Sequence, residues 1–385
     1  MGRSDLAGGE PAIGVRELGV TIGALPSGPT GTIIDVPGVG VGHATVSYDE
    51  PPPPDGRGTA RTGVTVVDPG GDCRVDPVPA GVSVLNGAGE LTCRSQIQEW
   101  GYIETPVFLT STMQVGRVYD AACQLLMAEH DELDEVIIPV VGECDDSWLS
   151  DPRTMHVTHE DVQSALAAAR SGGPFAHGAV GAGTGMHCLG WKGGIGSASR
   201  ILPDGHLVGV LLLTNFGSAE RLRIDGVPVG QHLLADSTHL DGRSSPQPGI
   251  DAGSRTSRQG PPPAGSCIGI VITDAPIDAA GCTRLAQRIG LGLARTGSVA
   301  HHGSGEIFLG LANGLRRSGC GGPAISGNDL DDYFTATVDA AEEAVLSSMI
   351  NAGSTTGHRA RTLPGLPLDE VRAILSRYRT DRRGR

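Results

Sequence analysis

A serine that could act as a nucleophile lies where a polar segment meets an apolar run. Ser266 follows Gly265 in the stretch PPPAGSCIGIVITDAP, residues 261–276. The three prolines hold the backbone extended and cannot enter the interior of a sheet. The run 267–273 is short, apolar on both faces and rich in β-branched residues, which predicts a strand buried on both sides. Because Gly265 lacks a Cβ, a hydroxyl group could reach its carbonyl carbon with little steric resistance.

This arrangement has two interpretations. In the first, Ser266 Oγ attacks the Gly265 carbonyl, and hydrolysis of the resulting ester leaves Ser266 as a new chain start. An α-amine has an ordinary pKa of roughly 7.7–8.0, so such a serine carries its own general base. In the second interpretation, Ser266 is an ordinary serine at a junction between a loop and a strand. This stretch alone leaves both interpretations open.

Three other places in the chain offer groups that could support such a nucleophile. Ser304 and Glu306 are two residues apart where a strand begins, so both side chains lie on one face and could relay a hydrogen bond to a nucleophile. Asn215 ends an apolar run, and its amide could donate to a developing oxyanion. Glu143 ends another apolar run and could bind a substrate ammonium group. Taken singly, each could equally be a turn residue, an edge residue or a backbone cap.

Composition excludes several classes of function. The net charge of −14 disfavours a polyanionic partner, and 3% aromatic residues disfavour stacking platforms for nucleic acid. Lys192 is the only lysine and follows Trp191, so the chain has no GK[ST] phosphate loop and only one residue that could form a Schiff base. The histidines at 156 and 159 and at 301 and 302 match no HExxH metal motif.

The location of the protein is predicted from its apolar runs and its cysteines. No run reaches the roughly 18–20 apolar residues of a membrane span, and the first residues lack the apolar core of a signal peptide. The eight cysteines are dispersed without a CxxC pair, which is typical of reduced thiols in a cytoplasm. We therefore expect a cytoplasmic protein with no membrane and no nucleic-acid partner.

The elements that must position these residues alternate between strands and helices, which predicts an α/β layered fold. At 385 residues the chain exceeds the roughly 250–300 residues of a usual single core, so two domains or one large layered domain would fit. Residues 31–46 are expected to form a strand, a glycine-rich turn and a second strand, and further strands are expected at 63–69, 81–87, 106–112, 136–143, 206–217, 267–273 and 305–314. Helices are expected at 91–100, 115–133, 159–170, 278–295, 338–351 and 368–378. Residues 178–200 contain too much glycine for regular structure, and 241–265 predicts an exposed polar linker.

Several blocks of the sequence together resemble one known family. GSCIGIVITDAP (265–276) resembles the cleavage-site signature of the L-aminopeptidase/D-esterase-amidase family, the D-aminopeptidase type that includes the β-peptidyl aminopeptidases. Further resembling blocks follow the same order along the chain: DVPGVGVGHATV (35–46), PVPAGVSVLNGAGE (77–90), PVVGECDDSWLSD (139–151), GAGTGMHCLGWKGGIGSASR (181–200), TNFG (214–217) and GSGEIFLG (303–310). Independent blocks in the same order make a chance match improbable.

The resemblance implies a fold and a processing event. Members have a single four-layer αββα sandwich, here 1–385, with two stacked sheets flanked by helices. The architecture is similar to that of N-terminal-nucleophile hydrolases but differently connected. Members cut themselves into two chains, which would here be an α chain of 1–265 and a β chain of 266–385, and they typically assemble as tetramers of the cleaved pair.

The resemblance also implies roles for the residues at matching positions. Ser266 would be the nucleophile, with Ser304 and Glu306 as its hydrogen-bonding partners and Asn215 as the oxyanion donor. Glu143 matches an acidic residue that holds the free amine of the substrate.

The chain departs from some relatives near the substrate pocket. Those relatives carry a tyrosine near the oxyanion, in the loop that corresponds to the one after Glu143. This loop has no tyrosine and only Trp148, which becomes a candidate substrate-binding residue. Neither the preference for α- or β-amino acids nor the preference for L- or D-residues follows from the sequence.

The function predicted from these residues and this resemblance is that of a serine aminopeptidase. It would release N-terminal residues from small peptides, amides or esters that carry a free amine, without a metal or an organic cofactor. One alternative is a self-cleaving acyltransferase of the ornithine-acetyltransferase type, which normally cuts itself at a threonine and so fits Ser266 poorly. Another is an inactive scaffold homologue.

Overall fold

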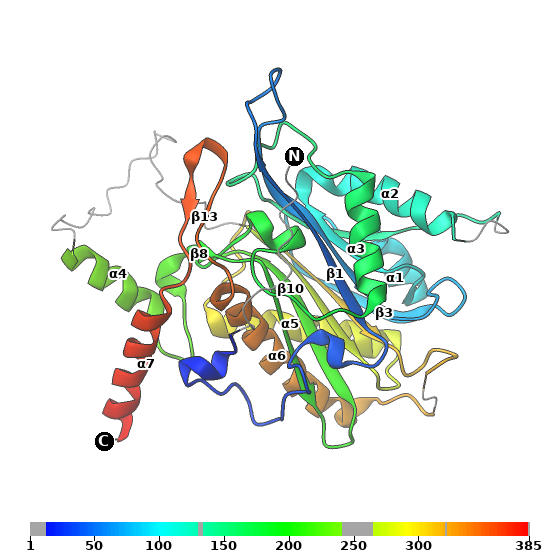
Figure 1. The fold of residues 1–385 in the computed structure, drawn as a ribbon. Helices are drawn as coiled ribbons and strands as arrows, with labels where there is room; N and C mark the ends of the chain where they lie inside the picture. The colour runs from blue at the N-terminus through cyan, green and yellow to red at the C-terminus, as the bar shows by residue number, and fades with distance from the viewer. Residues whose placement is uncertain (1–12, 130–133, 241–264, 320–321, 384–385) are drawn as a thin grey trace.

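The computed structural model describes residues 13–129, 134–240, 265–319 and 322–383. Two β-sheets lie face to face, with helices packed on the outer face of each (Figure 1). The smaller sheet has the strand order β1-β2-β5-β6 and consists of β1 (Gly40–Asp49), β2 (Thr59–Asp68), β5 (Val107–Ser111) and β6 (Val140–Cys144). Its β5 and β6 run parallel, and the other neighbours run antiparallel.

The larger sheet has the strand order β4-β3-β12-β11-β10-β9. It consists of β3 (Val78–Gly87), β4 (Tyr102–Ile103), β9 (Ile195–Ile201), β10 (Leu207–Asn215), β11 (Ser266–Thr273) and β12 (Gly305–Ala312). Only β11 and β12 are parallel neighbours in it. Two short hairpins complete the strands: β7 (His187–Cys188) with β8 (Trp191–Lys192), and β13 (Thr355–Thr356) with β14 (Thr362–Leu363).

The helices divide between the two outer faces and one edge. Helices α2 (Val115–Met127) and α3 (His159–Ser171) cover the smaller sheet, and α5 (Ala279–Thr296) and α6 (Asp331–Ile350) cover the larger one. Helix α1 (Arg94–Trp100) packs on β3, and α4 (Val229–Leu240) lies beside α7 (Leu368–Arg383) at the edge (Figure 1). The apolar residues form three layers, one between the sheets and one under each pair of helices. The expected αββα sandwich is therefore confirmed.

Strand β11 shows how the sequence pattern builds these layers. Ile268, Ile270 and Ile272 point into the layer between the sheets, whereas Cys267 and Val271 point toward α5 and α6. All eight residues of β11 are buried, as a strand that is apolar on both faces requires.

Glycines in the strands allow the outer helices to pack closely. A Cβ at Gly196 in β9 would lie 1.9 Å from the Ala344 carbonyl oxygen of α6. A Cβ at Gly42 in β1 would lie 2.1 Å from the Ala165 carbonyl oxygen of α3. Many of the 59 glycines of the chain therefore serve close packing rather than disorder.

Several expected elements differ from the observed ones. The first of the two strands expected within 31–46 is instead a 3₁₀ helix, Ile33–Asp35, and α6 begins seven residues before the expected 338. The glycine-rich 178–200 was expected to be irregular, but it contains a 3₁₀ turn, the β7–β8 hairpin and β9. Small residues give β9 no apolar alternation, and it is a strand because β10 pairs with it. The linker expected at 241–265 lies outside the described residues except for Gly265.

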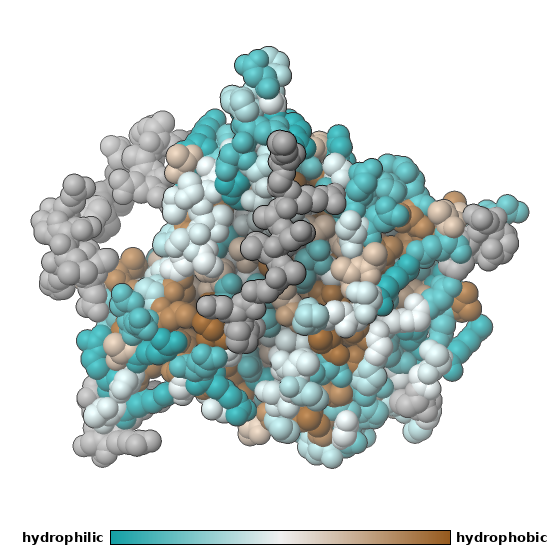
Figure 2. Space-filling view, in the orientation of Figure 1, coloured by the Kyte–Doolittle hydropathy of each residue, from teal (hydrophilic) through white to brown (hydrophobic). Residues whose placement is uncertain are grey.

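Other expectations about local structure are met. Thr158 caps α3, and its hydroxyl accepts a hydrogen bond from the Asp161 amide while Asp161 accepts one from the Thr158 amide at 2.9 Å. Within the described residues no helix combines the length and the apolar character that crossing a bilayer requires. Figure 2 shows that the viewed face is largely polar, with separate apolar areas.

The packing of α6 on β9 leads to a stability prediction. Gly196→Ala is expected to lower the free energy of unfolding by about 1–3 kcal/mol, because the added methyl group collides with a helix carbonyl. Gly116→Ala is the matched control, since it lies in α2 with no atom within 4 Å of its added Cβ, and it should stabilise by about 0.5–1 kcal/mol. Urea unfolding followed by circular dichroism measures both changes. Equal stabilities for the two variants would contradict this account of the packing.

Candidate active site

Ser266 lies where the ends of three strands meet. It is the first residue of β11, and its Cα partners are Asn215, the last residue of β10, and Gly305, the first residue of β12. The antiparallel β10 and the parallel β12 thus bring residues from distant parts of the chain to one edge of the larger sheet. Alternation along β11 puts the Ser266 side chain on the same face as Ile268, toward the smaller sheet.

A cavity of about 620 Å³ opens beside Ser266. Glu143 at the end of β6 and Thr112 just after β5 form part of its wall, together with Gly265. The remaining lining residues come from neighbouring loops: Ala88, Gly89, Glu90, Met113, Asp145, Ser147, Pro152 and Gly303. A small molecule in this cavity would therefore contact both the nucleophile candidate and several carboxylates.

Asn215 is buried next to Ser266, and two main-chain groups fix the orientation of its carboxamide. The His187 amide donates to Oδ1 at 3.1 Å, and Nδ2 donates to the Asp145 carbonyl oxygen at 2.8 Å. An N–H facing one end and a carbonyl facing the other leave only one orientation of the amide. The second hydrogen of Nδ2 remains available for another acceptor, such as an oxyanion at Ser266.

Ser304 and Glu306 form the hydrogen-bonded pair that their spacing indicated. Ser304 Oγ donates to Glu306 Oε1, and both side chains are buried. Burial raises the pKa of Glu306, and the hydrogen bond from Ser304 opposes that rise. The strand register sets Glu306 beside Cys267, on the face opposite the Ser266 side chain. A hydrogen bond from this pair to the nucleophile stays a prediction.

Glu143 lines the cavity with its carboxylate held in place. Its Oε1 accepts the Glu90 amide at 2.8 Å, and its Oε2 accepts the Thr112 hydroxyl. Burial raises the pKa of Glu143, and the two hydrogen bonds partly offset this rise. When ionised, this carboxylate could hold a positively charged amine in the cavity.

Trp148 does not line this cavity. The guanidinium of Arg361 stacks on its ring at 4.2 Å from the centroid. The residues of this loop that line the cavity are Asp145 and Ser147. The expectation that Trp148 contacts the substrate is therefore not supported by its place in the structure.

Two residues that hold the site together carry little signal in the sequence. Thr112 is the last residue of the predicted strand 106–112, and only its contact with Glu143 distinguishes it from other threonines. His187 acts through its main-chain amide, which no side-chain motif could have indicated. The glycine-rich stretch 178–200 is itself a signal, because glycine lets a backbone approach another group closely.

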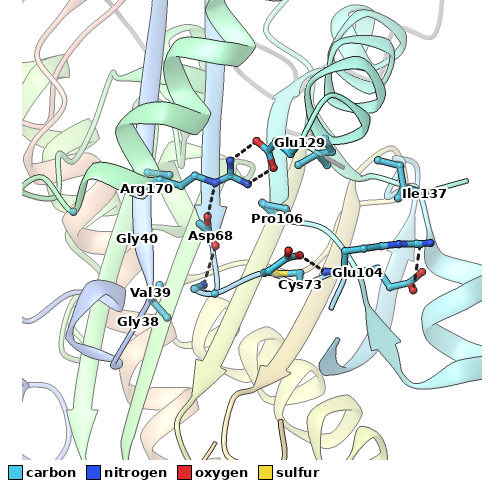
Figure 3. A pocket seen from close by; sticks show the side chains of 17 residues that line it. Gly38, Val39, Gly40, Asp68, Cys73, Glu104, Pro106, Glu129, Ile137 and Arg170 are labelled. Atoms are coloured by element: carbon cyan, nitrogen blue, oxygen red, sulfur yellow. Dashed lines mark hydrogen bonds and ion pairs between the residues drawn. The ribbon is translucent and has the colours of Figure 1, made fainter. Parts of the chain in front are cut away.

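A second cavity of about 600 Å³ lies at the other end of β5, near Pro106 (Figure 3). Its Arg170 binds Asp68 at 3.2 Å and both oxygens of Glu129 (Figure 3). Its thiol, at Cys73, has a pKa raised to about 12 by burial, so it is not a ready nucleophile. The cavity beside Ser266 is thus the better candidate for an active site.

No cluster of three or more His, Cys, Asp or Glu side chains is placed to bind a metal in the part of the chain that the structure describes. The ring of His156 is engaged at both nitrogens, by the Tyr48 hydroxyl at 2.7 Å and the Asp151 carbonyl oxygen at 2.9 Å.

Comparisons of the sequence with known proteins cover nearly the whole chain. A sequence model described as peptidase family S58 matches residues 31–363. β-Peptidyl aminopeptidase BapA of Sphingosinicella microcystinivorans is 38% identical over an alignment of 387 residues that covers 97% of this chain and 95% of the relative. The protein of the same name from Sphingosinicella xenopeptidilytica is 35% identical over an alignment of 372 residues that covers 94% of this chain and 90% of the relative. These matches confirm the resemblance that the sequence blocks indicated.

Solved structures give the same result for the fold. A β-aminopeptidase from Burkholderia sp. superposes with a TM-score of 0.81 at 36% identity, covering 95% of this chain and 99% of that one. The L-aminopeptidase D-Ala-esterase/amidase from Ochrobactrum anthropi superposes with a TM-score of 0.82 at 32% identity, covering 96% and 99%. The latter is described as a prototype of the serine aminopeptidases and a variant of the Ntn (N-terminal nucleophile) hydrolase fold. The two-sheet sandwich observed here is that fold.

Proposed function

The chain belongs to peptidase family S58 and is a serine aminopeptidase, and from that premise we propose that Ser266, freed by self-cleavage, is its nucleophile. Its substrates would be small peptides, amides or esters with a free N-terminal amine. β-Amino acids fall within this range, since curated relatives carry the name β-peptidyl aminopeptidase. The observation that carries the proposal is the register that sets Ser266 between Asn215 and Gly305, beside a cavity that contains Glu143.

The proposed self-cleavage begins with attack of Ser266 Oγ on the Gly265 carbonyl carbon. The Gly305 amide donates to the Gly265 carbonyl oxygen at 2.9 Å, so a donor already faces the atom that becomes negatively charged. The C–N bond then breaks, the nitrogen takes the hydroxyl proton, and an ester joins Gly265 to Ser266. Water hydrolyses this ester, which leaves a carboxylate on Gly265 and a free amine and hydroxyl on Ser266. The products are chains 1–265 and 266–385.

Peptide hydrolysis would use the same oxygen a second time. The Ser266 amine takes the proton of Oγ while Oγ bonds to the substrate carbonyl carbon, and the amine then passes that proton to the leaving nitrogen. The second hydrogen of Asn215 Nδ2 would stabilise the oxyanion, a contribution of about 2.7–4 kcal/mol for such donors. Water then releases the acyl group from Ser266. The buried Ser304–Glu306 pair would act as the hydrogen-bonding partner of Ser266.

Glu143 would bind the free amine of the substrate. Its hydrogen bonds from Thr112 and the Glu90 amide hold the carboxylate toward the cavity that Ser266 also lines. Selection for a free amine follows, because an acylated amine offers no charge to pair with a buried carboxylate. Assembly as a tetramer and a cytoplasmic location stay predictions.

Replacement of Ser266 tests the assigned nucleophile. Wild-type protein should give two fragments on a denaturing gel, and Ser266→Ala a single chain of 39.5 kDa that does not hydrolyse an aminoacyl p-nitroanilide. Ser164→Ala, in an exposed position on α3, is the control and should be cleaved and active like the wild type. Hydrolysis by purified Ser266→Ala would contradict the proposal, and an intact, inactive wild type would favour an inactive scaffold. Acyl transfer to an added amine in preference to water would favour the acyltransferase alternative.

Replacement of Glu143 tests the assigned amine site. Glu143→Gln should raise KM enough to lower kcat/KM by about 10-fold to 100-fold, since hydrogen bonds to charged groups contribute about 1.5–3 kcal/mol. For the wild type, KM should rise as pH falls through the raised pKa of Glu143, because the carboxylate becomes neutral there. The Gln variant should lack this rise.

Glu90→Gln serves as the matched control for that experiment. It removes the same charge from the exposed mouth of the cavity and should change KM less than about threefold, as for exposed pairs. Equal effects of the two substitutions would show that general charge, not a specific site at Glu143, attracts the substrate.

A further inference from the structure

The only lysine of the chain is fully buried against the segment that binds the proposed oxyanion donor. Lys192 has 0% exposure, and its ammonium donates to three main-chain carbonyl oxygens, those of Gly183 at 3.1 Å, Met186 at 2.8 Å and Gly193 at 2.6 Å. Among the described residues its ammonium donates to these carbonyls and to no carboxylate. Burial lowers the pKa of Lys192 to about 7, while the three carbonyl acceptors favour the charged form. A buried ammonium without a counter-charge is costly, by several kcal/mol in proteins, so its presence calls for a physical reason.

The three carbonyl groups belong to the segment that holds Asn215 in place. Lys192 pairs with His187 across the β7–β8 hairpin. The Met186 carbonyl, which accepts from Lys192, and the His187 amide, which donates to Asn215 Oδ1, are two ends of one peptide group. That peptide group is planar, so fixing its oxygen also fixes the direction of its N–H.

We propose that Lys192 is a positioning residue for Asn215 and acts through the peptide group between Met186 and His187. The ammonium pulls electron density toward the carbonyl oxygen, which strengthens the N–H as a donor to Asn215 Oδ1. The Asn215 carboxamide is polarised in turn, and its free Nδ2 hydrogen becomes a better donor to the oxyanion. The positive charge thus acts on the transition state across two amide groups without contacting the substrate.

Two further main-chain hydrogen bonds connect the segment around the β7–β8 hairpin to the residues on either side of Asn215. The Leu189 amide donates to the Phe216 carbonyl at 2.7 Å, and the Thr214 amide donates to the Gly194 carbonyl at 3.0 Å. These bonds attach the segment on both sides of Asn215, so a shift at Lys192 would be transmitted to the carboxamide. Misplacement of a catalytic group by about 1 Å can cost roughly 100-fold in rate.

This proposal rests on the proposed role of Asn215, and the experiment separates the two. Lys192→Met, purified and checked for the two fragments, is assayed with an aminoacyl p-nitroanilide. We expect kcat to fall about 10-fold to 100-fold with KM changed less than threefold. In an Asn215→Ala background the same substitution should change kcat less than threefold, because its effect passes through Asn215. If Asn215→Ala alone leaves kcat unchanged, Asn215 is not the oxyanion donor. That result contradicts the proposed function itself and not only the role of Lys192.

A matched control and a second variant make the outcome decisive. Arg200 is another buried cation, bound to Glu343 at 2.6 Å and to the Ile22 carbonyl at 2.9 Å, at the end of β9 away from Asn215. Arg200→Met should lower the unfolding midpoint without lowering kcat of the folded enzyme. Lys192→Gln keeps N–H donors at this position but removes the positive charge. If Lys192→Met does not fold, Lys192→Gln tests whether the charge itself contributes to kcat.

Three results would overturn the proposal. The first is an equal loss of kcat from Lys192→Met with and without Asn215. The second is a folded Lys192→Gln enzyme with unchanged kcat. The third is failure of both Lys192 variants to fold, which would make Lys192 a purely structural residue.

Discussion

The main-chain pairing of β10, β11 and β12 is the constraint on which the rest of the site depends. It fixes Ser266 opposite both Asn215 and Gly305, although these residues are far apart in the chain. Backbone hydrogen bonds, not side-chain contacts, set this geometry, so it can be the same before and after a cut at Gly265. The layer of isoleucines beneath β11 keeps the three strand ends in one register, because a slip by one residue would turn Ser266 away from the cavity.

Around that register, buried polar groups are held by main-chain partners. Asn215 is bound at both ends by backbone groups, Glu143 accepts the Glu90 amide, and Lys192 donates only to carbonyls. Groups that are hydrogen-bonded inside a protein interact more strongly than in water and do not need to reorganise during a reaction. The same arrangement gives many of the 59 glycines a role, since glycines let backbone approach backbone closely.

Much of this architecture could be predicted from the sequence, and the reasons for the failures are physical. Strand β11 was predicted because its apolar residues occupy both faces, and the Ser304–Glu306 pair because their spacing sets them on one side. Strand β9 was missed because its small residues carry no alternation and depend on pairing with β10. Trp148 is a candidate for the pocket because the loop after Glu143 has no tyrosine, and the sequence does not show that its ring stacks with Arg361. The hydrogen bonds of Lys192 could not be predicted either, because main-chain carbonyl groups occur at every residue and form no sequence motif.

The self-cleavage mechanism requires that the working enzyme begin one of its chains with Ser266. The first residue of the smaller chain can be determined by N-terminal sequencing and by the mass of the intact fragments from a fully active preparation. We expect a chain that starts at Ser266 with an unmodified amine and a second chain that ends at Gly265. Full activity in an uncut polypeptide, or in chains that start at any other residue, would contradict it.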